Sequence, residues 1–258
     1  MLPVKRHALP LILISLTAAG AWAAKDSCFE CHGVEEGTSV VFKDDIHYRY
    51  GISCADCHGG DPKEDEGNLA MSASRGFKVR VTREGTPEVC GRCHGDAAVM
   101  SKYKPGLRTD QLALYRQSVH GELLAQANRK AANCVDCHGV HNIRAVADAQ
   151  SPAHPSNLSG KCGACHVEIA AMFRESPHAK VFTTTGMAGC SACHSSHATE
   201  RADTDMLTGA KPVCARCHAP DSAGGKAAAI MTRRIASLPP ADRRARAREA
   251  AHALKLAP

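Results

Sequence analysis

The chain has 258 residues, of which 14 are cysteine and only 4% are aromatic. So few large apolar side chains exclude an ordinary self-sufficient hydrophobic core for a chain of this length. The formal net charge is +6, but Lys5, Arg6 and the segment after Asp221 carry most of the excess, so the middle of the chain is close to neutral. Something other than side-chain packing must therefore hold this polypeptide together.

The N-terminal segment has the pattern of a secretory signal peptide. Lys5 and Arg6 form a short positive region, and residues 9–20 are almost entirely apolar. Residues 21–23 (AWA) then supply an A-x-A cleavage site. The apolar run is shorter than the roughly 20 residues that a membrane-spanning helix needs, which favours cleavage over an uncleaved anchor. We therefore expect residues 1–23 to be removed and the mature protein to be periplasmic or secreted.

Every cysteine lies in a Cys-x-x-Cys-His motif, and the motif occurs seven times. The motif cysteines are Cys28, Cys31, Cys54, Cys57, Cys90, Cys93, Cys134, Cys137, Cys162, Cys165, Cys190, Cys193, Cys214 and Cys217. The histidines that follow them are His32, His58, His94, His138, His166, His194 and His218. In an exported protein, paired cysteines ordinarily indicate disulfides, but disulfides give no reason for the seven histidines.

The motif is the attachment signature of c-type haem. Two thiols about one helical turn apart can both reach the vinyl groups of one haem, and the adjacent histidine then binds the iron. Zinc sites would leave surplus thiolates, since each motif already offers three ligands. The sequence therefore predicts seven covalently attached c-type haems, with the motif histidines as proximal ligands.

The motifs form an internal repeat. Residues 90–161 and 162–213 share one plan: a motif, a helical stretch, a Ser-x-His segment, and a second motif followed three residues later by another histidine. Residues 28–89 form a degenerate copy, in which Asp61 stands at the position of that last histidine. The motif at residues 214–218 closes the array.

The remaining histidines nearly supply a sixth ligand for each iron. Six of them are the predicted distal ligands: His47, His120, His141, His154, His178 and His197. A histidine three residues after its own motif cannot turn back onto its own haem, so we expect it to serve a neighbour. Six candidates leave one iron without a named ligand. His252, Met100, Met172, a histidine of another subunit and an open coordination site are the alternatives, and the sequence does not assign each histidine to an iron.

The stretch CGRCHGDAAVMSKY…LYRQSVHGELL…CVDCHGVH, followed by CGACHVEIAAMFRESPHAK…CSACHSSH, resembles the multihaem cytochromes of the cytochrome c3-like, doubled-CXXCH group. The resemblance spans about residues 28–218. It implies low-potential, mostly bis-histidine haems packed close together and wrapped by short helices and loops. It also implies a role in periplasmic or extracellular respiratory electron transfer. Asp61 departs from the pattern of the group.

We expect a mainly α fold with extensive loops and little sheet, wrapped around a closely packed haem array. The array domain should span residues 24–220, with so few residues per haem that separate pockets cannot form. Folding should then depend on haem attachment. The alternation in Phe77–Val81 predicts one short strand.

Residues 221–258 are predicted to form a basic helical tail, with eight Lys or Arg and three Asp or Glu. Pro240 is well placed in the first turn of a helix. The tail is either a solvated helix or a docking arm for an acidic partner or an anionic membrane surface. Export argues against a nucleic-acid partner.

The leading hypothesis is an electron carrier rather than an enzyme, with no catalytic residues. Its partners would be redox proteins, such as other cytochromes or membrane quinol-linked complexes. One alternative is a multihaem oxidoreductase with an open-coordinate haem that acts on a small nitrogen or sulfur compound. A second alternative is a subunit of a haem filament, and the oligomeric state stays open. No motif departs from Cys-x-x-Cys-His, which favours the carrier.

Overall fold

The computed structural model describes residues 26–33, 41–239 and 242, and these residues form helices and loops without a strand. The α-helices are α1 (Ser27–His32), α3 (Ile46–Arg49), α4 (Cys54–His58), α5 (Gly67–Ala70), α6 (Thr86–His94), α7 (Ala97–Met100), α8 (Gln111–Arg116), α9 (Val119–Ala125), α10 (Cys134–His138), α11 (Leu158–Gly163), α12 (Val167–Arg174), α13 (Pro177–Thr185), α14 (Ser191–His194), α15 (Thr204–Thr208) and α16 (Ala223–Ala236). Two 3₁₀-helices are η1 (Ala73–Arg75) and η2 (Val213–Arg216). The predicted mainly α fold with extensive loops is confirmed.

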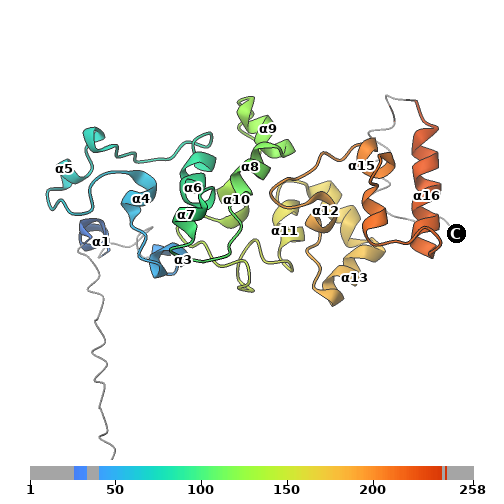
Figure 1. Cartoon of the computed structure of the whole chain (residues 1–258), viewed down its shortest axis with the longest axis horizontal. Coiled ribbons are helices and arrows are strands. Elements are labelled where there is room, and N and C mark those ends of the chain that lie inside the picture. Colours follow the sequence, from blue (N-terminus) through green and yellow to red (C-terminus); the bar gives the residue numbers. More distant parts are fainter. Residues whose placement is uncertain (1–25, 34–40, 240–241, 243–258) are drawn as a thin grey trace, which may run out of the picture.

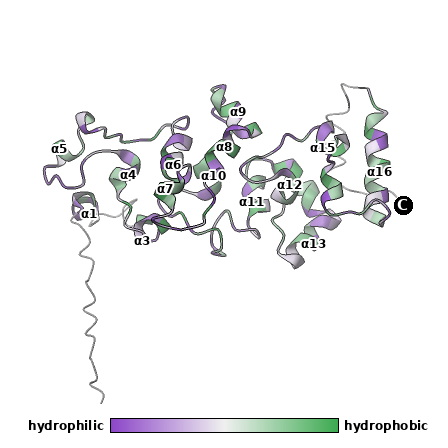
Figure 2. Ribbon diagram, in the orientation of Figure 1, coloured by the Kyte–Doolittle hydropathy of each residue, from purple (hydrophilic) through white to green (hydrophobic). Residues whose placement is uncertain are grey.

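The helices follow one another along the long axis of the molecule in nearly chain order (Figure 1). Helices α1, α4 and α5 lie at one end, and α15 and α16 lie at the other. Figure 2 shows apolar and polar residues mixed within most helices rather than gathered into one apolar layer. The chain is therefore extended along an axis instead of folding around one central core.

The apolar core of the described residues is thin. Its buried hydrophobic residues are Phe42, Ala70, Met100, Leu124, Ala131, Ala153, Ala170, Phe182, Leu207, Val213 and Ile235. One compact cluster joins α15, η2 and α16 through Leu207, Val213 and Ile235. The first part of the predicted tail thus packs on the preceding repeat.

The strand predicted at Phe77–Val81 is wrong. Val79 is 77% exposed, and the part of the chain that the structure describes contains no strand that could pair with this segment. Instead, its backbone docks on the second motif, because the Lys78 amide donates to the carbonyl oxygen of His58 at 2.8 Å. The segment serves the motif histidine rather than a sheet.

Among the described residues, no helix has both the length and the apolar character needed to cross a bilayer. The predicted signal peptide (residues 1–23), His252 and the predicted helix that starts near Pro240 lie outside the described residues, apart from Asp242.

Candidate functional site

The second motif of each of the first two repeats is folded as a short, doubly capped helix. In α4, the Ser53 side chain accepts from the Ala55 amide, and the Asp56 carboxylate accepts from the Ser53 amide. Asn133 and Asp136 form the same capping box at α10. Such reciprocal caps fix the first residue of a helix. The helix therefore begins at the first motif cysteine, which sets the two thiols one turn apart on one face.

The same motifs end on a residue with positive φ. Gly59 has φ 73° and ψ −165°, and Gly139 has φ 86° and ψ −176°. In the third copy, α14, the position is held by Ser195, with φ 65° and ψ 172°. That region is strained for a residue with a Cβ atom. The rest of the fold must therefore stabilise the turn after the motif histidine by more than the backbone strain at Ser195 costs.

None of the 14 cysteines, all of which lie in the described residues, is paired in a disulfide, and successive motifs lie side by side. Burial is the main cause that raises the pKa of Cys57 to about 11, with a further contribution from Cys90 of the next motif. The hydrogen bond with Cys162 lowers the pKa of Cys190 below its ordinary value. The electrostatically coupled pairs between consecutive motifs are Cys28–Cys54, Cys57–Cys90, Cys90–Cys134, Cys137–Cys165, Cys162–Cys190 and Cys193–Cys214. The seven attachment motifs therefore form one row in chain order.

Five of the six predicted distal histidines lie opposite a motif histidine. The ring centroids are 6.0 Å apart in His58–His141, His47–His94 and His138–His197, 6.2 Å apart in His120–His166, and 5.8 Å apart in His178–His218. Two imidazoles that bind one metal ion through bonds of about 2 Å hold their ring centres about 6 Å apart. Each pair thus has the separation of two axial ligands on opposite sides of one iron.

The pairs follow one rule of exchange between repeats. A histidine of a Ser-x-His segment lies opposite the first motif of the next repeat, as His120 lies opposite His166. A histidine three residues after a second motif lies opposite the second motif of the preceding repeat, as His197 lies opposite His138. None of these five pairs therefore lies within a single repeat.

The backbone shows the same exchange. The Ile46 amide, one residue before His47, donates to the carbonyl oxygen of Ile143 at 2.8 Å. The Val119 amide occupies the equivalent place one repeat later and donates to the carbonyl oxygen of Thr199 at 3.0 Å. Both bonds join a segment that carries one distal histidine to the loop that carries another.

Helix capping places the histidines of the Ser-x-His type. Ser118 caps α9 by accepting from the Gly121 amide at 3.0 Å, and Ser176 caps α13 by accepting from the Ala179 amide at 3.3 Å. Asp45 takes this role at α3. In each case the histidine is the second residue of the helix, where the cap fixes its direction.

The electrostatics of the pairs favour neutral imidazoles. Burial is the main cause that lowers the pKa of six of these histidines, and neighbouring histidines lower most of them further. These six are His94, His120, His138, His141, His178 and His197. A neutral imidazole has the lone pair that a metal ion needs. Among the motif histidines, His58 also bonds through Nδ1 to the Lys78 carbonyl oxygen at 2.9 Å, which leaves Nε2 for a metal ion.

The structure does not bring the sixth predicted ligand, His154, against a motif histidine among the described residues. Its Nδ1 instead lies 2.7 Å from Oγ of Ser156. Met100 is buried, with 7% of its surface exposed. The motif histidines His32 and His194 belong to none of the five pairs, and each of them interacts with other residues.

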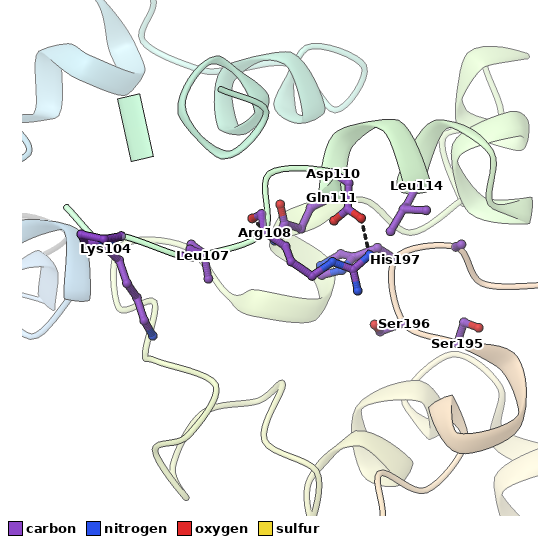
Figure 3. A pocket seen from close by; sticks show the side chains of 12 residues that line it. Lys104, Leu107, Arg108, Asp110, Gln111, Leu114, Ser195, Ser196 and His197 are labelled. Atoms are coloured by element: carbon purple, nitrogen blue, oxygen red, sulfur yellow. Dashed lines mark hydrogen bonds and ion pairs between the residues drawn. The ribbon is translucent and has the colours of Figure 1, made fainter. Parts of the chain in front are cut away.

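A cavity of about 670 Å³ lies beside His197. Figure 3 shows the side chains of Arg108, Asp110 and His197 close together, with Lys104 farther along the segment that leads to Arg108; all four line the cavity. The volume falls in the range of sites for large organic cofactors, about 300–1,000 Å³. Arg108 forms an ion pair with Asp110. The cavity combines room for a large ring, a ligating side chain and cations for an anionic substituent.

The sequence missed the partner of each histidine and the capping role of Asp45. The repeated Ser-x-His spacing, with Asp45 at the serine position two residues before His47, was the available signal for the cap. The partners could not be read from spacing, because every pair joins two different repeats.

Comparison with known proteins gives two matches to family models. The cytochrome c3 family model matches residues 46–154. The model of the family described as cytochrome c554 and c-prime matches residues 14–59 and 161–236. No curated protein and no solved structure matches the chain. The two families divide the repeat region between them, and each covers less than half of the chain.

Proposed function

Because the chain is a multihaem c-type cytochrome, we propose that it passes single electrons along seven covalently bound c-type haems, in the periplasm or outside the cell. The similarity to both families supports an electron-transfer protein that carries covalent haem c and exchanges electrons with redox partners. The observation that carries the proposal is the set of five histidine pairs, with ring centroids 5.8–6.2 Å apart.

In this proposal each histidine pair would hold the iron of one haem. The haem of motif 54–58 takes His58 and His141, that of motif 90–94 takes His94 and His47, and that of motif 134–138 takes His138 and His197. The haem of motif 162–166 takes His166 and His120, and that of motif 214–218 takes His218 and His178. His154 remains the proposed ligand of one further haem. Haem c supplies reversible one-electron chemistry at its iron.

The protein residues hold the cofactors and exclude other chemistry. The cysteines would fix each ring to a motif helix, and the paired neutral imidazoles would hold the iron between them and keep substrates away from it. Lys104 and Arg108 line the cavity beside His197 and would pair with the propionates of a haem there.

The row of motifs suits a carrier. Consecutive motif cysteines are close enough for their charges to interact along the whole series, and the helices follow the long axis in chain order (Figure 1). An electron that enters at one end of such a row can leave at the other. The proposed partners are other cytochromes or membrane quinol-linked complexes, with the basic tail as a contact to an acidic partner or membrane surface.

Haem attachment and folding should be coupled, because ligands are exchanged between repeats. A repeat that binds its own rings is still incomplete until its neighbour supplies the distal histidines. The thin apolar core of the described residues adds little stabilisation without the rings. We therefore propose that the chain reaches its native state only with its haems attached.

Two measurements test the proposal. The intact mass of the mature protein should show seven added haems, and EPR of the oxidised protein should show low-spin iron for each assigned pair. His141→Ala should convert one low-spin iron to high spin. Asp61→Ala is the matched control, because Asp61 holds the equivalent position in the degenerate repeat and should leave the spectrum unchanged. An unchanged spectrum in His141→Ala would contradict the ligand assignment. A high-spin iron in the wild type that binds nitrite or hydroxylamine would favour the oxidoreductase instead.

A further inference from the structure

Asp45 is a fully buried carboxylate at the centre of the ligand exchange. Its relative exposure is 0%. Oδ1 accepts from the His47 amide and lies 2.8 Å from His47 Nδ1, and Oδ2 accepts from the Ile143 amide at 2.6 Å. A buried carboxylate is costly unless its oxygens are hydrogen-bonded, and here three donors satisfy it. Ile143 lies two residues after His141, so one side chain touches the segments that carry the distal histidines of two neighbouring motifs.

The equivalent caps elsewhere do not reach a histidine ring. Ser118 Oγ accepts from the Gly121 amide and donates to the Tyr115 carbonyl oxygen at 2.7 Å. The hydroxyl of Ser176 accepts from the Ala179 amide. A serine in this position is therefore sufficient to start the helix and place the histidine. The carboxylate of Asp45 makes an additional bond to the ligand itself.

That bond fixes the ring of His47 in two respects. Because the carboxylate accepts, Nδ1 of His47 carries the proton, and Nε2 is the nitrogen left for the iron. The ring of His47 is also held at 85° to the ring of His94, whereas the rings of His138 and His197 lie at 11° to each other. Nearly perpendicular imidazole planes leave two d orbitals of a low-spin iron almost equal in energy. Such an iron gives a strongly anisotropic EPR signal, whereas parallel planes give an ordinary rhombic signal.

We propose that Asp45 is a positioning residue that locks His47 across its iron and, through the hydrogen bond to Nδ1, lowers the reduction potential of the haem on Cys90 and Cys93. A carboxylate that accepts from a ligating imidazole makes the imidazole a stronger donor. A stronger donor stabilises the oxidised iron relative to the reduced iron, since second-shell hydrogen bonds are one of the levers that set haem potentials. This inference rests on the proposed pairing of His47 with His94.

The test uses two substitutions of Asp45 in the holoprotein, with an EPR-monitored redox titration. Asp45→Ser gives this helix the cap that α9 and α13 already have, and removes the bond to the ring. Asp45→Asn keeps an oxygen that can accept from Nδ1 but removes the charge, so it reports on the potential even if the serine variant loses haem. Asp44→Ser is the matched control, because Asp44 is the exposed neighbouring carboxylate and the change in net charge is the same.

In both Asp45 variants the midpoint of the low-spin signal of the haem on Cys90 and Cys93 should rise, while the midpoints of the haems other than the one proposed for His58 and His141 stay within error. In Asp45→Ser the most anisotropic signal should also move toward a rhombic shape. Midpoints and line shapes equal to those of Asp44→Ser would overturn the inference. His47→Ala separates the two proposals. If it produces no high-spin iron, the proposed pairing itself fails, whereas a high-spin iron together with silent Asp45 variants refutes only the role of Asp45.

Discussion

Replacing Ser195 with glycine should stabilise the holoprotein. Ser195 has φ 65° and ψ 172°, a region that is essentially restricted to glycine and costs another residue about 1–3 kcal/mol. Glycine loses more conformational freedom on folding, which offsets about 0.5–1 kcal/mol of the gain. The net expectation is an increase of about 1 kcal/mol in the free energy of unfolding, or about 2–4 °C in Tm for a chain of this size.

The assay is thermal unfolding of the oxidised holoprotein, followed by circular dichroism in the haem absorption band. Ser196→Gly is the matched control, because Ser196 is its exposed neighbour and lacks a positive φ, so only the entropic loss should remain. The converse change, Gly139→Ser, should lower the Tm by a similar amount. A Cβ atom there meets only the Asn142 side chain at 3.3 Å, so its effect reports backbone strain rather than a clash. A Tm for Ser195→Gly at or below that of Ser196→Gly would refute the reasoning.

Three further predictions concern the same framework. In Gly224→Ala, the new Cβ would lie 2.1 Å from Nδ1 of His218, so one haem should show an altered EPR signal; Gly160→Ala, where nothing lies within 4 Å, should not. Arg83→Ala removes an ion pair of 2.6 Å with the partly exposed Asp136. It should lower the free energy of unfolding, measured by chemical denaturation, by about 1 kcal/mol. An unchanged free energy of unfolding would show that the ion pair does not stabilise the fold. Burial holds the pKa of six paired histidines below the ordinary value. The contribution of these histidines to the stability of the fold should therefore be fully present above about pH 6.5 and decline as the pH falls below it. A low-spin absorbance and a Tm that stay constant from pH 8 to pH 4 would contradict this.

The sequence predicted the attachment motifs and the α-helical character because both depend on local chemistry. The spacing in Cys54–His58 is a one-turn spacing, and the residues that start and end this helix, Ser53 and Gly59, are its immediate neighbours. The predicted strand at Phe77–Val81 failed because alternation alone does not supply a partner strand. The partner of a histidine such as His141 was beyond prediction for a similar reason, since His58 lies in another repeat and only the folded chain brings the two together.

The exchange rule gives a physical reason for Asp61, which the sequence could only record as a departure. A histidine at this position would face the second motif of a repeat that precedes residue 28, and the sequence has no such motif before Cys28. Asp61 instead forms an ion pair with Arg75 at 2.5 Å. We therefore predict that Asp61 does not bind iron, and its ion pair holds the loop around α5.

The same rule accounts for two departures at the other end of the array. Ser222 caps α16 by accepting from the Gly225 amide at 3.0 Å, as the serine of a Ser-x-His segment does, but the place of the histidine is taken by Gly224. A histidine there would face the first motif of a further repeat, and none follows His218 in the sequence. Pro177 stands at the position equivalent to Ile46 and Val119. The backbone amides of those two residues donate to the loop that follows the second motif of the next repeat. A proline has no amide hydrogen to donate, and the closing motif at residues 214–218 is followed by no second motif whose loop could accept that hydrogen bond. Asp61, Pro177 and Gly224 thus stand at the three positions where the printed sequence offers the exchange no partner motif.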